Sequence, residues 1–390
     1  MFKEIGDLRH FKNFSRIILP VSIAFFIYTF GWGVVSPMFS IFVNNITKST
    51  FLTGVILSIT TLFGVLLDIP FMLIIDRLNM KRVLQIVLLA YVGFALLYPV
   101  ANNTFSLLLI SIGRGVASSF LWLTSWSYVF NFANKKVRGK ESGFFSSMND
   151  FASGVAPLVG GFATLTAFLL PFYVLAATSF AAFIVVSLFV HASPRVKKVL
   201  IASQFAALFR NMKKPNFLKT MFLIVIFYAL INVFYSFIAI LLNSEGISVF
   251  YIGLLLTVAL LPAVALEVPI GNAIDKHGVR KMLSIAAVLT ATTGILFTLS
   301  NNLFYIAAFL LAFTVSYTTI FIALYSRMSD LIKKESITLM GPIATIKDLG
   351  YTIGPLMGGW LIGVISIGPA FMVTGAAFAV LVPVALTLHD

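Results

Sequence analysis

The chain has 390 residues, of which 60% are hydrophobic and only 10% are charged. So few charges cannot coat a soluble globule of this size, which excludes that class of protein. The formal net charge is +14, and the absence of cysteine excludes disulfide bonds and thiolate metal sites.

The N-terminal segment 1–16 is predicted to be an amphipathic helix on the cytoplasmic surface of the membrane. Its apolar residues recur every three positions from Phe2 to Phe14, with basic residues between them. This pattern is typical of helices that lie in the membrane interface. No small-residue cleavage site follows, so we do not expect a cleaved signal peptide.

Apolar stretches long enough to cross a bilayer then recur along the chain, separated by turn signals such as Ser300-Asn301-Asn302. They predict an all-α integral membrane protein with twelve transmembrane helices. The first six lie near 17–43, 52–75, 83–100, 105–131, 142–163 and 172–190, and the others near 220–242, 251–274, 282–299, 305–328, 340–363 and 370–388. We therefore expect six-helix bundles at 17–190 and 220–390, joined by a basic cytoplasmic linker at 191–219.

The basic residues are distributed very unevenly between the two sides of the membrane. All but three of the 27 Lys and Arg residues fall in the N-terminal tail, in the even-numbered loops or, as Arg327 does, at the cytoplasmic end of a predicted span. Lys48 lies in the first outer loop, and Arg114 and Lys347 lie within spans. This positive-inside bias predicts a multi-pass protein of the plasma membrane with both termini in the cytoplasm. The positive charge thus reflects insertion and contact with membrane lipids, and we expect no nucleic-acid partner.

The sequence repeats itself. Residues 54–84 match 253–283 at a spacing of 199 residues, and residues 143–161 match 341–359 at a spacing of 198. In the first pair, Asp68 within the membrane corresponds to Glu267. Two copies in a hydrophobic chain of this length indicate a pseudo-symmetric membrane protein, an architecture typical of secondary transporters.

Each copy of the first repeat ends in a short charged loop. The loops contain Asp76, Arg77, Lys81 and Arg82 in the first copy, and Gly271, Asp275, Lys276, Gly278 and Arg280 in the second. Each loop has an acid followed by a base, then a tight turn, then further bases. This order resembles the signature loop of the major facilitator superfamily. The first copy has Met72 and Asn79 where that loop has glycines. Asparagine tolerates the left-handed turn conformation, so Asn79 is a mild substitution for glycine.

The second repeat resembles the antiporter motif of the same superfamily. Helix 11 carries its complete spacing, with Gly341, Gly350, Gly354, Pro355, Gly358 and Gly359. Helix 5 carries Gly143, Pro157, Gly160 and Gly161, with Ala152 and Ala156 in place of glycines. Small residues and prolines at this spacing allow close, bent helix packing. The motif is thus interpreted either as packing that any twelve-helix carrier needs or as a specific sign of antiport.

The resemblance covers the whole chain and is closest to drug:proton antiporters. It implies two bundles that rock about a central cavity. It also implies that Asp76 stabilises the N-terminus of helix 11 near Gly341 when the cytoplasmic side is shut. Asp275 would act in the same way at helix 5, near Gly143. A carboxylate at a helix N-terminus meets the positive end of the helix dipole.

Six ionisable residues lie within the predicted spans and away from the span ends: Asp68, Arg114, Asp150, Glu267, Lys347 and Asp348. Each is costly in hydrocarbon and needs a partner or water. The packing implied by the resemblance brings helix 2 beside helix 11 and helix 8 beside helix 5. Glu267 would then approach Asn149 or Asp150. We hypothesise that Asp68 and Lys347 form an inner gate and that Glu267 and Asp150 form a proton switch, with Asp348 or Arg114 as a further partner. Alternatively, these acids only hold helices together or face a wet cavity.

Several aromatic residues fall on helices that line the cavity in the resembled fold. They are Tyr28, Trp32, Trp122, Trp126, Tyr228, Tyr235 and Tyr317. Such rings can stack on an apolar or aromatic substrate. Packing against lipid is the alternative for each of them.

These patterns predict a proton-coupled secondary transporter that exports small lipophilic compounds by alternating access. One alternative is an importer or exchanger of a polar or anionic metabolite, held by Arg114. A second is a sensor or scaffold with a carrier fold. No catalytic or phosphate-binding motif appears in the sequence, so we expect no enzyme activity, cofactor or metal. The expected partners are a small-molecule substrate, protons and lipids, and the expected state is a monomer.

Overall fold

The computed structural model describes residues 18–75, 78–132, 138–191, 210–211, 213–335 and 340–388. The predicted interfacial helix at 1–16 and most of the predicted linker at 191–219 lie outside these residues. Asp76 and Arg77 of the first charged loop also lie outside them.

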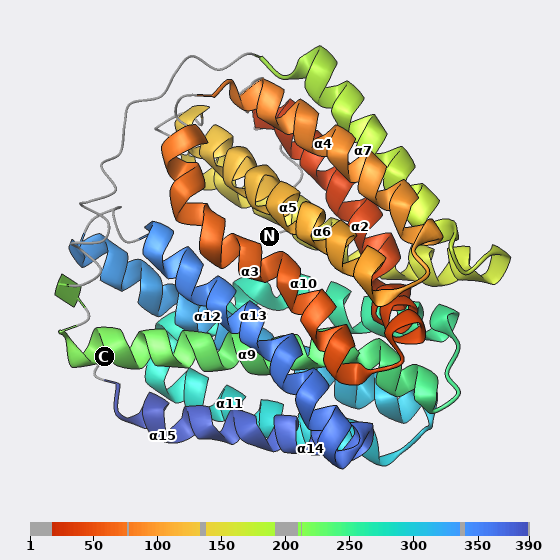
Figure 1. The fold of residues 1–390 in the computed structure, drawn as a ribbon. Helices are drawn as coiled ribbons and strands as arrows, with labels where there is room; N and C mark the ends of the chain where they lie inside the picture. The colour runs from red at the N-terminus through yellow and green to blue at the C-terminus, as the bar shows by residue number, and fades with distance from the viewer. Residues whose placement is uncertain are drawn as a thin grey trace.

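The first half of the chain folds into six long helices, coloured red to yellow-green in Figure 1. They are α2 (Ile18–Thr47), α3 (Thr50–Ile75), α4 (Met80–Leu97), α5 (Thr104–Phe132), α6 (Arg138–Thr166) and α7 (Leu170–Phe189). A short 3-10 turn, Tyr98–Val100, follows α4. Helix α2 packs against α6 and α7, while α5 packs against α3 and α4.

The second half repeats this arrangement, coloured green to blue in Figure 1. Its helices are α9 (Pro215–Ser244), α10 (Val249–His277), α11 (Val279–Leu296), α12 (Leu303–Glu335), α13 (Met340–Ile365), and a last span made of α14 (Ile367–Ala377) and α15 (Leu381–Leu386). Turns of 3-10 helix at Phe297–Leu299 and Phe378–Val380 follow α11 and α14. The predicted all-α fold with twelve helices in two repeated halves is confirmed, and the predicted spans fall on these helices.

Helices are the expected outcome, because a single segment in lipid must satisfy its own backbone hydrogen bonds. Ten of the described helical segments are long and apolar enough to cross a membrane. The other two, α6 and α13, carry Asp150, Lys347 and Asp348, and they stand at the boundary between the halves. There α3 packs against α13, and α6 packs against α10. Figure 1 shows α3 and α13 running side by side. We call these two contacts the α3/α13 seam and the α6/α10 seam.

Alternating helix direction gathers the basic residues at one end of the molecule. Helix α4 begins with Lys81 and Arg82, α11 begins with Arg280 and Lys281, and Lys214 directly precedes α9. We call this the basic end. The short connections at 48–49, 245–248 and 300–302 lie at the opposite end.

Both seams are tight at the opposite end. A Cβ atom on Gly253 would overlap the carbonyl oxygen of Pro157, and one on Gly54 would overlap that of Pro355. Hydrogen bonds join the helices there, since the Leu158 amide donates to Thr257 Oγ1 at 3.0 Å. The Thr50 hydroxyl likewise donates to the Gly359 carbonyl oxygen at 3.1 Å.

Towards the basic end, the α6/α10 seam is open. A Cβ atom on Gly143 or on Gly271 would meet nothing within 4 Å. Asp275 is exposed at this end, and its predicted contact with the α6 N-terminus stays a prediction. The predicted contact of Asp76 with α13 lies outside the described residues. The structure is therefore closed at one end of the α6/α10 seam and open at the basic end.

The glycines of the second motif face different neighbours. On α13, Gly350, Gly354 and Gly358 approach α9, while Gly359 approaches α3. On α6, Gly160 approaches α2 and Gly161 approaches α10. Where Ala152 and Ala156 replace glycines on α6, the partner helix α2 supplies Gly33, whose bare Cα leaves room for the Ala156 methyl group. Helices α2 and α6 therefore pack closely here, with the glycine on α2 and the alanine on α6.

Asn79 does not use the left-handed conformation that asparagine tolerates. Its backbone is extended, with φ −75° and ψ 108°, and its side chain accepts hydrogen bonds from the amides of Lys81 and Arg82. Asn79 therefore caps the N-terminus of α4 instead of forming a left-handed turn. The second copy differs, because Gly278 has φ 84°, a conformation that favours glycine.

Asn79→Ala should lower the free energy of unfolding by about 1 kcal/mol, because two amides of the first turn of α4 lose their acceptor. Chemical unfolding in mild detergent measures this loss. Asn301→Ala is the matched control, since Asn301 is exposed in the loop before α12. Equal stability of both variants and the wild type would contradict the capping role.

Candidate functional site

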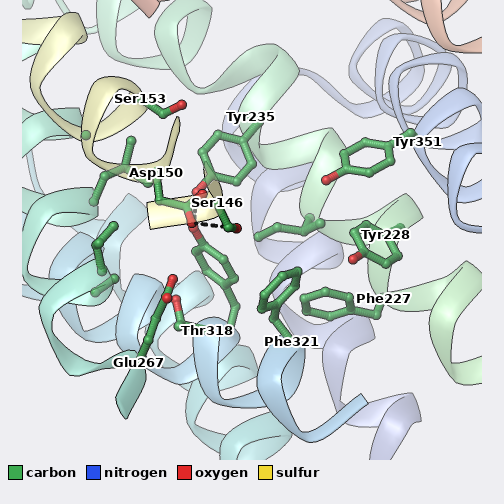
Figure 2. A pocket seen from close by; sticks show the side chains of 16 residues that line it. Ser146, Asp150, Ser153, Phe227, Tyr228, Tyr235, Glu267, Thr318, Phe321 and Tyr351 are labelled. Atoms are coloured by element: carbon green, nitrogen blue, oxygen red, sulfur yellow. Dashed lines mark hydrogen bonds between the residues drawn. The ribbon is translucent and has the colours of Figure 1, made fainter. Parts of the chain in front are cut away.

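A cavity between the halves has six aromatic side chains among the 16 residues that line it. It has a volume of about 460 Å³ and is bounded by α6 from the first half and by α9, α10, α12 and α13 from the second. Its rings are Phe227, Tyr228, Tyr235, Tyr317, Phe321 and Tyr351. We call it the tyrosine cavity (Figure 2). Of the aromatic residues predicted for the second half, Tyr228, Tyr235 and Tyr317 all line it.

Two acids from opposite halves lie on its wall. Asp150 comes from α6 and Glu267 from α10, and both border the tyrosine cavity. Asp150 accepts a hydrogen bond from the Ser146 hydroxyl at 3.3 Å, drawn as a dashed line in Figure 2. The hydroxyl groups of Tyr235 and Tyr317 hydrogen-bond to each other beside these acids. Two neighbouring carboxylates with little water repel each other, and a proton on either relieves the repulsion.

Asn149, the other partner considered for Glu267, points elsewhere. Its side-chain oxygen accepts a hydrogen bond from Thr29 on α2 at 3.0 Å. Its side-chain nitrogen donates to the Phe145 carbonyl oxygen at 2.9 Å. Of the two neighbours on α6, the structure therefore places Asp150 in the same cavity as Glu267.

A second cavity lies within the first half. It has a volume of about 240 Å³ and is bounded by α2, α5 and α6. Four residues of the first half that were predicted to lie at the site line it: Tyr28, Trp32, Arg114 and Trp122. We call it the arginine cavity. Asp150 and Ser153 line both cavities, so the two adjoin at α6. Trp126, also predicted to line a cavity, packs its ring against Phe145 and Trp122.

Arg114 is deeply buried, with 6% of its surface exposed. One guanidinium nitrogen donates to Thr60 Oγ1 at 2.6 Å, and the guanidinium carbon lies 4.1 Å from the centre of the Trp32 ring. Its Nε has no hydrogen-bond partner. Within the described part of the chain, no acid lies within 4 Å of Arg114. The acid partner considered for Arg114 is thus not found in this conformation.

The α3/α13 seam holds a separate charged cluster. Asp68 on α3 is 7% exposed and faces Asp348 on α13 within hydrogen-bonding range. Ser119 on α5 lies beside Asp68, and its hydroxyl donates a hydrogen bond to the Gly115 carbonyl oxygen at 3.4 Å. Lys347 lies near both acids, and its Nζ is 3.9 Å from Asp348. Among the described residues, the acid nearest Lys347 is therefore its neighbour Asp348, and the predicted direct Asp68–Lys347 pair is replaced by a cluster of three charges.

Lys347→Met should lower the free energy of unfolding on the order of 3 kcal/mol, because two buried carboxyl groups would face each other without a cation. Thermal unfolding of the purified protein measures the change. Adding Asp348→Asn to the same chain should recover most of the loss, since only one acid then remains. An unchanged stability of Lys347→Met would show that the lysine does not hold this seam.

Some of the lining residues escape prediction from the sequence. Tyr351 and Ser146 lie one helical turn from Lys347 and Asp150, and this spacing was an available signal. Phe227 and Phe321 carry no such mark, because α9 and α12 are rich in phenylalanine and other apolar residues along their length. For such helices the pattern does not indicate which face meets the cavity.

The charged loops are described in part. Lys81 donates a hydrogen bond from Nζ to the Ser187 carbonyl oxygen at 2.8 Å and so ties α4 to α7. Lys276 and Arg280 are exposed around Gly278, and Arg82 is exposed at the start of α4. These residues have no direct contact with either cavity.

Comparisons with known proteins agree with this architecture. The family model described as Major Facilitator Superfamily matches residues 21–248 and 220–390. The chain is similar to the structure of a bacterial homologue of the human lysosomal transporter Spinster, solved in an inward-facing and unoccupied conformation. The TM-score is 0.73 and the sequence identity is 16%, and the match covers 95% of this chain and 94% of that chain. It is also similar to the nucleoside transporter NupG, with TM-score 0.79, 13% identity and coverage of 96% and 99%. At these identities the likeness shows the fold. No curated protein matches the sequence.

Proposed function

Since this chain belongs to the Major Facilitator Superfamily, a family of membrane transporters, we propose that it is a proton-coupled secondary transporter that exports small lipophilic compounds by alternating access. The observation that carries the proposal is the pair of acids, Asp150 and Glu267, on the wall of one aromatic cavity. One acid belongs to each half of the molecule. A proton or a cationic substrate at this pair therefore acts on both halves at once.

Coupling follows from competition for the same charge. A proton on Asp150 or Glu267 removes a negative charge that a lipophilic amine needs for binding. Binding of the proton then opposes binding of the amine, and the reverse. Each ligand shifts the equilibrium between the inward-open and outward-open conformations, because it binds one of these conformations more tightly than the other. The aromatic rings of the tyrosine cavity supply apolar contact and cation–π attraction for such an amine.

The seams support alternating access. The α6/α10 seam is tight around Gly253 and open around Gly271. If the basic end faces the cytoplasm, as the positive-inside rule predicts, the described conformation is open to the inside. An exporter would collect its substrate in this conformation. We propose a plasma-membrane location with both termini in the cytoplasm on the same basis.

A second candidate function is an importer or exchanger of a polar or anionic metabolite. The specific observation in its favour is Arg114, which borders the arginine cavity with no acid within 4 Å in the described structure. A sensor with a carrier fold would share all of these features, and it differs only in carrying no flux.

Flux in proteoliposomes tests the proposal. Purified protein is reconstituted, a pH gradient is imposed, and movement of a lipophilic cation dye is followed with the membrane potential clamped and protein-free vesicles as the control. We expect the dye to cross the membrane in the direction opposite to the flow of protons. No dye movement by folded protein would contradict lipophilic export, and metabolite-driven flux without dye flux would favour the second candidate.

A further inference from the structure

Arg114 is a buried cation on the wall of the arginine cavity, and no acid of the described residues lies within 4 Å of it. It is 6% exposed, its Nε has no partner, and its hydrogen bond to Thr60 is to a neutral group. The acid nearest in the arginine cavity, Asp150, is held by Ser146 and lies beyond 4 Å of the guanidinium group. A buried, unpaired charge is costly to keep in a membrane protein. Its presence at a cavity wall therefore indicates a negatively charged ligand.

The surroundings of Arg114 orient it for such a ligand. The Trp32 ring lies 4.1 Å from the guanidinium carbon and the Phe39 ring lies 5.3 Å away, so the planar group is held against aromatic faces. A guanidinium group held in one plane can donate two parallel hydrogen bonds to a carboxylate or phosphate. The nearby side chains of Thr29 and Asn149 are uncharged and hydrogen-bonded to each other, so they supply no negative charge.

The opposite charge lies in the adjoining cavity. Glu267 borders the tyrosine cavity, and Asp150 and Ser153 line both cavities at their junction. A single molecule that passes Ser153 would therefore have Arg114 at one end, Asp150 beside its middle and Glu267 at the other end. The rings of Trp32 and Tyr235 provide aromatic contact on the two sides of this junction.

We propose that the substrate is a small zwitterion, whose carboxylate or phosphate binds Arg114 in the arginine cavity while its amine lies near Glu267 in the tyrosine cavity. This inference rests on the proposed function in taking these two cavities as the substrate site. It adds a charge requirement that lipophilicity alone does not contain. It is independent of the direction of transport.

Binding of matched probes tests the proposal by calorimetry on the full chain in detergent. Para-(aminoethyl)benzoate carries both charges, phenethylamine carries only the amine, and para-ethylbenzoate carries only the acid. We expect the wild type to bind the zwitterion about tenfold more tightly than either probe, because each end adds a charge-assisted hydrogen bond or ion pair. Tyramine phosphate replaces the carboxylate by a phosphate, and its affinity relative to para-(aminoethyl)benzoate identifies the preferred anion.

Variants assign the two ends. Arg114→Gln should bind the zwitterion and phenethylamine equally, with unchanged affinity for phenethylamine. Glu267→Gln should lose the advantage of the zwitterion over para-ethylbenzoate. Arg114→Lys keeps the positive charge but loses the planar guanidinium group, so it should prefer the zwitterion over phenethylamine by a smaller factor than the wild type. This variant provides the test if Arg114→Gln does not fold.

Three results would overturn the proposal: equal wild-type affinity for the zwitterion and phenethylamine, no binding of the zwitterion, or a full advantage retained by Arg114→Gln. The outcome separates from that of the proposed function. Tight zwitterion binding without gradient-driven flux would keep this inference and contradict proton coupling. Equal probe affinities with intact dye flux would do the reverse.

Discussion

Gly253→Leu is expected to reduce transport strongly and to hold the protein open at the end opposite the basic end. Even one added carbon at Gly253 would overlap the Pro157 carbonyl oxygen, so the α6/α10 seam cannot close there. Overpacking of a tight contact costs about 1–3 kcal/mol. A change of that size shifts a two-state equilibrium by roughly 5–150-fold. The conformation open at the basic end should become rare.

The absence of native cysteine makes this shift easy to measure. A single Ser153→Cys substitution places a thiol where both cavities meet. A membrane-impermeant maleimide should label it mainly from the basic side in the otherwise unchanged chain and mainly from the opposite side in Gly253→Leu. Gly93→Leu on α4 is the matched control, because a Cβ atom there meets nothing within 4 Å. Unchanged labelling in Gly253→Leu would contradict the proposed role of this seam.

Glu267→Gln is expected to abolish gradient-driven accumulation of substrate while leaving exchange of substrate across the membrane in place. Glutamine keeps the size of the side chain but removes the site that a proton occupies. The proton gradient then no longer changes the charge on the α10 wall of the tyrosine cavity. Asp150→Asn should have the same effect from the α6 side, because the two acids border one cavity.

Parallel assays of gradient-driven uptake and substrate counterflow in proteoliposomes separate these activities. Glu245→Gln is the matched control, since Glu245 is an exposed residue directly after α9. It should behave as the wild type in both assays. If Glu267→Gln and Asp150→Asn both keep full gradient-driven uptake, the proton switch lies elsewhere in the molecule.

The fold was predictable from the sequence because its two strongest signals are physical necessities. Apolar stretches in a bilayer must form helices, and a repeat spacing of 199 residues requires two similar halves. The same repeat placed Asp68 and Glu267 at equal depth. The expectation that Glu267 faces helix 5 depended on that depth and on the resembled packing, and the structure places Glu267 and Asp150 on one wall.

The details that the sequence could not supply depend on rotation and conformation. Asn149 and Asp150 are adjacent, and a rotation of α6 by one residue decides which of them meets Glu267. Asp348 rather than Lys347 faces Asp68 most directly for the same reason on α13. Asn79 replaces a turn glycine by capping the next helix, a solution that the loop motif does not indicate. The open basic end is a property of one conformation, and no sequence pattern selects it.

Proton release on substrate binding tests the central claim most directly. Purified wild-type protein and the Glu267→Gln variant are placed in separate, weakly buffered detergent solutions with a pH indicator. The lipophilic cation dye is then added to each. If substrate and proton compete for Asp150 and Glu267, the wild type should release protons as the dye binds, and Glu267→Gln should release fewer. Dye binding to the wild type without proton release, or equal release by both proteins, would contradict the account.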